Sequence, residues 1–349
     1  MIYHFDRLVE SVQTNCHIAD ARHAGDLTLC TYLLEMREFY RWEQGIAFSQ
    51  QPLRAEVGKW LSAREALWLS LESSDFLALP VEDRQFEPFA VGEINEVLAP
   101  HGLVYGAGVG VFGKPQFFLG KLEREECRGG ARILVAGCEY ARDLAAAPAG
   151  LRDSTIFLRQ ESLRRWLWEK FESWAIKKSD GALKTTLEAY GFDRDPYSAL
   201  ERMTNAESET LVLHELGELE VGKLLGEEWS TMRASFTGRR AELLARAVRD
   251  NLADCLVTLP TLLEREAATS IHFWFSNFDG MRRELFPRMA SAYTAWRAGD
   301  RMRAVGTAVF AGREHWHAVC ERLLALHRSW GAEAEVHIES LIVTPGTCL

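Results

Sequence analysis

The chain has 349 residues, of which 47% are hydrophobic and 26% are charged, and this composition excludes an intrinsically disordered protein. The net charge of −10 at pH 7 argues against a general nucleic-acid or anionic-membrane surface, because both partners attract a cationic face. We therefore expect a small-molecule substrate, with no nucleic acid and no membrane among the partners. The sequence leaves the oligomeric state open.

Helical periodicity dominates the N-terminal part, where helices are predicted at residues 27–44, 56–71 and 91–98. On the first of these, Leu29 and Met36 lie on the apolar face, whereas Glu35 and Glu38 are expected in solvent. The acidic stretch with two prolines that precedes the third helix, residues 72–90, predicts a loop.

The pattern changes after residue 102, and runs rich in β-forming residues predict strands at 103–111, 116–123 and 131–137. Glycine-containing turns separate these runs and favour an antiparallel sheet. Gly108, Gly110 and Gly113 match G-x-G-x-x-G, but a strand rather than a helix is predicted next, so no dinucleotide fingerprint is indicated. Alanines and a proline at 145–150 predict a linker.

From residue 160 onward the pattern is almost wholly helical, with helices predicted at 160–176, 180–190, 196–203, 205–226, 239–259, 281–297 and 312–330. The predicted fold class is mainly α: a helical bundle with a small antiparallel β-sheet inserted near residues 103–138. Two domains are expected, a helical N-terminal region with the sheet at 1–150 and a C-terminal helical bundle at 151–349.

The seven cysteines are widely spaced and form no C-x-x-C pair, a usage typical of a reducing compartment. The N-terminal residues show no signal-peptide pattern, and no apolar run approaches the ~18 residues of a membrane span. The sequence therefore predicts a cytoplasmic protein.

His214 and Glu218 are four residues apart within the predicted helix 205–226, which places them on one face about 5–6 Å apart. That helix is apolar nearly all round, so its acids and its imidazole need partners. A metal ion would satisfy both side chains. The alternative is a direct hydrogen bond between them, or a salt bridge to an arginine elsewhere.

Asp250 and Asp254 form a second pair at the same spacing, and like charges there repel unless a positive group lies between them. A metal ion would supply that charge, although Arg246 offers Asp250 a simple salt bridge. His272, in an aromatic stretch nearby, is the natural further nitrogen ligand, although a histidine among aromatic residues is more often a satisfied core residue. The predicted metal ligands are thus His214, Glu218, Asp250, Asp254 and His272.

A third group lies near the N-terminus, where His17, Asp20, Arg22 and His23 are expected to gather in a loop. There the histidines and the aspartate would surround a cation or an anionic substrate, and Arg22 would pair with a carboxylate or phosphate. These four are the candidate catalytic residues, for acid–base work. The structural alternative pairs Asp20 with Arg22 and uses Asp26 to cap the following helix.

The stretch from Ala21 to Glu43, together with His214-Glu-Leu-Gly-Glu218, resembles an uncharacterised family of bacterial hypothetical proteins with no assigned activity. The likeness covers most of the chain and implies no catalytic residues. The combination of carboxylates and histidine in a bundle is also similar to carboxylate-bridged helical-bundle metalloenzymes in general. Here H-x-x-x-E and D-x-x-x-D replace the paired E-x-x-H motifs of those enzymes.

Several oxygen donors with imidazole suit iron or manganese better than a thiolate-preferring metal. The sequence therefore predicts a metal-dependent enzyme, a non-haem iron or manganese oxidoreductase acting on an unknown small molecule. Two alternatives stay open. One is a non-catalytic helical scaffold or maturation and interaction protein without metal. The other is a metal-free enzyme that uses the 17–23 segment on an acidic small molecule.

Overall fold

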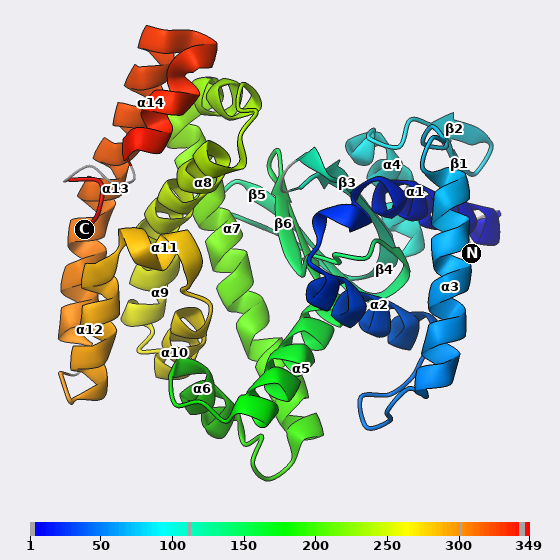
Figure 1. The fold of residues 1–349 in the computed structure, drawn as a ribbon, viewed down its shortest axis with the longest axis horizontal. Coiled ribbons are helices and arrows are strands. Elements are labelled where there is room, and N and C mark those ends of the chain that lie inside the picture. The colour runs from blue at the N-terminus through cyan, green and yellow to red at the C-terminus, as the bar shows by residue number, and fades with distance from the viewer. Residues whose placement is uncertain (1–3, 111–112, 301, 342–345) are drawn as a thin grey trace. The chain divides into compact units, whose positions relative to one another are not determined.

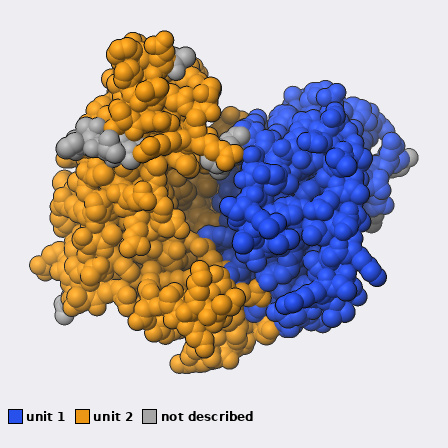
Figure 2. Space-filling model, viewed as in Figure 1, with its two compact units in different colours: residues 1–127, 132–152, 157–169 blue, residues 128–131, 153–156, 170–349 orange. Residues whose placement is uncertain are grey.

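The computed structural model describes residues 4–110, 113–300, 302–341 and 346–349, and the chain divides into two compact units (Figures 1 and 2). Unit 1 comprises Met1–Cys127, Arg132–Arg152 and Phe157–Glu169. Unit 2 comprises Arg128–Ala131, Asp153–Ile156 and Lys170–Leu349. Over the described ranges, no helix combines the length and the apolar character needed to cross a membrane.

Unit 1 combines helices with two sheets. Its helices are α1 (Phe5–His23), α2 (Leu29–Glu43), α3 (Arg54–Leu71), α4 (Val91–Leu98) and the first part of α5 (Gln160–Lys177), with 3-10 turns at Ala24–Asp26 and Ala99–His101. The strands are β1 (Leu79–Val81), β2 (Arg84–Phe86), β3 (Leu103–Val109), β4 (Pro115–Arg128), β5 (Ala131–Arg142), β6 (Ala149–Arg152) and β7 (Thr155–Arg159).

The prediction of a small sheet inserted near residues 103–138 in a helical bundle is wrong. The structure has a curled five-stranded sheet in the order β3-β4-β5-β7-β6, and a separate β1–β2 hairpin in the segment predicted as a loop. The sheet is larger than its apolar pattern indicates, because β4 continues to Arg128 through a mostly exposed stretch that carries few apolar residues. β6 begins inside the alanine-rich segment 145–150 that predicted a linker. The predicted end of the first strand, residue 111, lies outside the described residues.

The core of unit 1 shows why the residues of α1, which lie outside the helices predicted above, form a helix. Leu8, Val12, Cys16 and Ala19 are all buried at helical spacing. They share one core with residues of α4, β3 and β4. In the sheet, Gly106 of β3 leaves room for the Phe118 ring of β4, its partner in the antiparallel register. Because the apolar side chains of α1 face this core, the polar residues of the helix point toward other partners.

Unit 2 is mainly helical, and it also holds short ends of β4, β5 and β7 and the last residues of α5. Its helices are α6 (Ala182–Tyr190), α7 (Pro196–Ala234), α8 (Arg239–Ala253), a π-helical turn η4 (Asp254–Thr258), α9 (Leu259–Glu264), α10 (Ala268–Ser276), α11 (Gly280–Leu285), α12 (Pro287–Arg297), α13 (Arg303–Trp330), a 3-10 turn at Gly331–Glu333 and α14 (Ala334–Ser340). Residues from α7, α8, α10, α13 and α14 contribute to one apolar core.

Helix α7 joins the two helices that the sequence predicts at 196–203 and 205–226 into a single element. The Asp195 side chain caps its start by accepting from the backbone N–H groups of Tyr197 and Ser198, and Pro196 occupies the first helical position. The helical dihedral angles are interrupted only at Gly226. The long helix therefore presents His214 and Glu218 from its middle, on a rigid element.

Candidate metal centre

Helices α7 and α8 approach closely at the candidate site. A Cβ atom on Gly217 of α7 would lie 2.6 Å from the backbone oxygen of Ala253, the last residue of α8, so only glycine permits this packing. His214 and Glu218 flank Gly217 on α7. Asp250 lies on α8, and Asp254 opens the π-helical turn that continues it. Single π-helical turns inside helices are frequent at functional sites.

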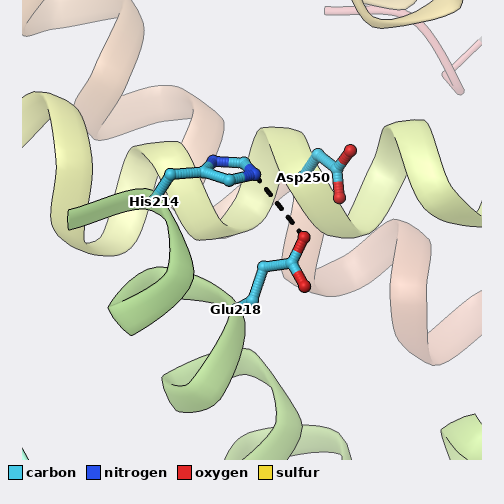
Figure 3. A group of neighbouring side chains, drawn as sticks. All are labelled: His214, Glu218 and Asp250. Atoms are coloured by element: carbon cyan, nitrogen blue, oxygen red, sulfur yellow. Dashed lines mark ion pairs between the residues drawn. The ribbon is translucent and has the colours of Figure 1, made fainter. Parts of the chain in front are cut away.

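Three side chains converge between these helices (Figure 3). One donor atom each from His214, Glu218 and Asp250 lies within 4.8 Å of the other two. The His214 Nε2 atom is 3.5 Å from a Glu218 carboxylate oxygen. The three side chains are between 13% and 25% exposed, so none of them is completely shielded from solvent. A group of one imidazole and two carboxylates can hold a divalent cation.

Asp254 has a different position from the other two acids. Its side chain is 1% exposed, and one carboxylate oxygen lies 2.9 Å from His214 Nδ1. The other oxygen accepts from Arg282, whose guanidinium also lies over the rings of Trp274 and Phe278. With Nδ1 engaged by Asp254, Nε2 is the nitrogen that faces Glu218. A carboxylate behind a histidine is the arrangement that orients metal-bound histidines in proteins.

Arg249 is the cation that lies at these carboxylates in the structure. Its guanidinium forms an ion pair with Glu218 and lies 3.0 Å from an Asp250 carboxylate oxygen. The expected salt bridge between Arg246 and Asp250 is not observed among the described residues. Arg246 pairs instead with Glu242, at 3.5 Å. Two arginines on one helix are three residues apart, and no sequence signal says which of them faces α7.

The pKa values follow from burial opposed by close charges. Burial lowers the pKa of His214, but the charges and hydrogen bonds of Asp254 and Glu218 outweigh it and leave the pKa well above its ordinary value. Burial raises the pKa of Glu218, but Arg249 and His214 bring it down to about 2. Burial raises the pKa of Glu215, with a contribution from Glu218, to about 8. With Glu215 neutral, the group carries three negative charges, on Glu218, Asp250 and Asp254. The positive charges of Arg249, Arg282 and the protonated His214 lie against them.

His272 has other partners than this group. Its Nδ1 atom lies 3.0 Å from the Tyr293 hydroxyl, and its ring stacks on Trp296 with 4.1 Å between centroids. Burial lowers the pKa of His272, which favours the neutral ring. The structure thus brings together four of the five predicted metal ligands, and Asp254 lies behind His214. His272 lies apart from them, against the rings of Tyr293 and Trp296.

The prediction that His17, Asp20, Arg22 and His23 gather in a loop is wrong, because all four lie on α1, and a straight helix points residues at this spacing in different directions. Only His17 and Asp20 are buried. His17 Nε2 lies 2.5 Å from an Arg64 nitrogen, and burial together with that charge lowers the pKa of His17 to about 3.

The other three residues of this set also have separate partners. Asp20 accepts from Lys114 at 2.8 Å and from the backbone of Leu144, so its pairing with Arg22 is not observed. Arg22 donates to two backbone carbonyls, and His23 lies 3.3 Å from Asp26. The following helix α2 is capped by Thr28 rather than Asp26. The four residues therefore share no common site.

Unit 1 contains buried ion pairs that the sequence pattern does not predict. Glu38, expected in solvent, is 1% exposed and pairs with Arg37 and Arg41. Glu139 is buried with Arg159 and Ser162. The pair of Glu139 and Arg159 joins two different strands, which no local pattern indicates. Glu38 lies on the polar side of an amphipathic helix, where periodicity predicts an exposed side chain.

Comparison with known proteins identifies the domains but no activity. Two profiles of a family of unknown function (DUF6866) match the chain, its N-terminal domain at residues 7–159 and its C-terminal domain at residues 164–345. No curated protein and no solved structure matches the chain.

Proposed function

Because the chain belongs to the DUF6866 family, whose function is unknown, its chemistry has to be inferred from its own residues, and we propose that it is a metal-dependent enzyme. The proposed site holds one divalent iron or manganese ion through His214 Nε2, Glu218 and Asp250 of unit 2. The main support is that these three donors converge, and that the other ring nitrogen of His214, Nδ1, is engaged by the buried Asp254.

The donor set supports this choice of metal. Carboxylate oxygens with imidazole suit iron and manganese, whereas the described cysteines contribute no thiolate to the group. Three protein ligands leave coordination positions open, where a bound metal ion activates water, oxygen or a substrate. A non-haem oxidoreductase acting on a small molecule is the reaction class that we propose. The free cysteines also support our proposal of a cytoplasmic location.

One observation favours a second candidate, a metal-free scaffold or interaction protein. Arg249 and Arg282 already pair with the carboxylates of the group, and the resulting network is balanced in charge. In a network of this kind, arginine side chains neutralise the buried carboxylates, so that no metal ion is needed. The two candidates differ in one measurable property, the binding of a stoichiometric metal ion.

Metal content separates these candidates. The full chain, purified without a histidine tag or chelator and loaded anaerobically with ferrous or manganous ion, is expected to retain close to one metal ion per chain. His214→Ala removes the only nitrogen donor and is expected to abolish retention while helical circular dichroism stays unchanged. Elemental analysis after desalting measures both, and oxygen consumption with a reductant then tests the reaction class.

The matched control is His315→Ala. His315 is a half-buried histidine of unit 2 whose Nε2 atom donates to the Thr347 carbonyl, 3.0 Å away. This variant should retain metal as the wild type does. If the loaded wild type holds no metal, the proposed function is wrong and the metal-free scaffold takes its place. If His214→Ala holds as much metal as the wild type, the proposed site is wrong.

A further inference from the structure

Arg249 has no role in the proposed function, yet its guanidinium lies at the proposed metal ligands. Its ion pairs within the described residues are with Glu218 and Asp250, the two carboxylates of the site. The side chain is 14% exposed. The guanidinium therefore stands where a divalent ion bound by both carboxylates would stand.

A guanidinium and a metal ion cannot share these oxygens. Both are cations, and both need the carboxylate lone pairs that point into the small space between α7 and α8. The pairs with Glu218 and Asp250 hold the two acids toward each other. Without a cation, the two carboxylates would repel across a site that is mostly shielded from water.

The geometry points to Arg249 as a built-in competitor of the metal ion: it keeps Glu218 and Asp250 together in the metal-free protein and must leave them when a divalent cation binds. This inference rests on the proposed function. It adds that the protein itself limits its affinity for the metal ion, because the measured binding free energy then includes the cost of displacing the guanidinium. Removing the guanidinium should lower the stability of the metal-free protein and raise its affinity for the metal ion.

The test is manganous-ion binding by the full chain, measured by calorimetry and by thermal unfolding with and without metal. Arg249→Gln is expected to bind manganous ion at least tenfold more tightly than the wild type. Its unfolding temperature should be lower than that of the wild type without metal and should rise more on addition of metal, because a ligand that binds only the folded state stabilises it.

Two further variants guard against misfolding and general charge effects. Arg249→Lys keeps a cation at the same position and is expected to bind manganous ion within about threefold of the wild type. Arg246→Gln removes a positive charge from the same helix, one turn away and paired with Glu242, and should also change the affinity by less than about threefold.

The outcomes separate this inference from the proposed function. Tighter binding by Arg249→Gln than by both the wild type and Arg249→Lys supports the inference. Equal binding by all four proteins overturns it while the metal site stands. If Arg249→Gln does not fold, Arg249→Met, which keeps the aliphatic stem without the charge, takes its place, and the same two outcomes support or overturn the inference. Absence of binding in every protein overturns both proposals.

Discussion

At the scale of single residues, the buried charges of this protein are matched by partners from other parts of the chain. Asp20 is fully buried and meets Lys114 and a backbone N–H group. Even with Lys114 beside it, burial raises the pKa of Asp20 to about 6. Burying ions in this way is tolerated only because each keeps a charged or hydrogen-bonding partner.

His17 gives a pH dependence with a definite sign. Its pKa is lowered to about 3 from an ordinary value of 6.5, so the unfolded chain binds a proton that the folded chain excludes as the pH falls below 6.5. His17 therefore destabilises the fold progressively between pH 6.5 and 3. His17→Gln should lose about 2 kcal/mol less stability than the wild type between pH 7 and pH 5.

Urea denaturation at the two pH values measures this difference. His317→Gln, at an exposed histidine of unit 2, is the control and should follow the wild-type pH dependence. Parallel pH profiles for His17→Gln and the wild type would show that His17 takes up a proton in the folded protein.

At the scale of elements, the candidate site is a consequence of how closely α7 and α8 pack. The pairs His214–Glu218 and Asp250–Asp254 each follow from the helical repeat of four residues. Their convergence follows from Gly217, which lets the backbone of α7 approach that of Ala253. A larger residue at this point would separate the two helices and the donors that they carry.

Gly217→Ala tests this packing. Its new Cβ would meet the Ala253 backbone, so we expect a destabilisation of about 1–3 kcal/mol from overpacking, although alanine favours helices. Metal retention should fall with it. Gly222→Ala, on the same helix with open space around its Cβ, should instead be neutral or stabilise by up to about 1 kcal/mol. Denaturant unfolding compares the two, and equal stability of both variants would contradict the close approach.

At the scale of the whole molecule, each compact unit has its own apolar core, one built on a sheet and one on helices. The proposed metal site lies within unit 2, and so do Arg249 and Arg282, the two arginines that pair with its acids. Unit 1 contributes its own buried ion pairs, such as Glu139 with Arg159. The thiols are divided between buried and exposed positions across both units.

Thiol accessibility tests this distribution. Cys30, Cys127, Cys138 and Cys348 are exposed, whereas Cys16, Cys255 and Cys320 are buried, and burial raises the pKa of each buried thiol. A thiol reagent should modify the four exposed cysteines rapidly in the native protein and the remaining three only after unfolding. A smaller total in the unfolded, unreduced chain would reveal a disulfide and contradict the free thiols.

Features that depend on local repeats could be predicted from the amino-acid sequence. Helical periodicity located most of α2 to α8, and the spacing of four residues placed His214 with Glu218 and Asp250 with Asp254. The short strands β6 and β7, the exposed end of β4 and the helix α1 were not predicted, because their apolar patterns are short or interrupted by polar residues that pair inside the fold.

Which charged side chains form pairs depends on how the helices pack against one another. The choice of Arg249 over Arg246, the place of Asp254 behind His214, and the separation of His272 all depend on the rotation and spacing of packed helices. Local propensity acts within a few residues, whereas these contacts join residues tens of positions apart. Their positions are set by the packing of apolar faces and by the close approach at Gly217, which no local pattern encodes.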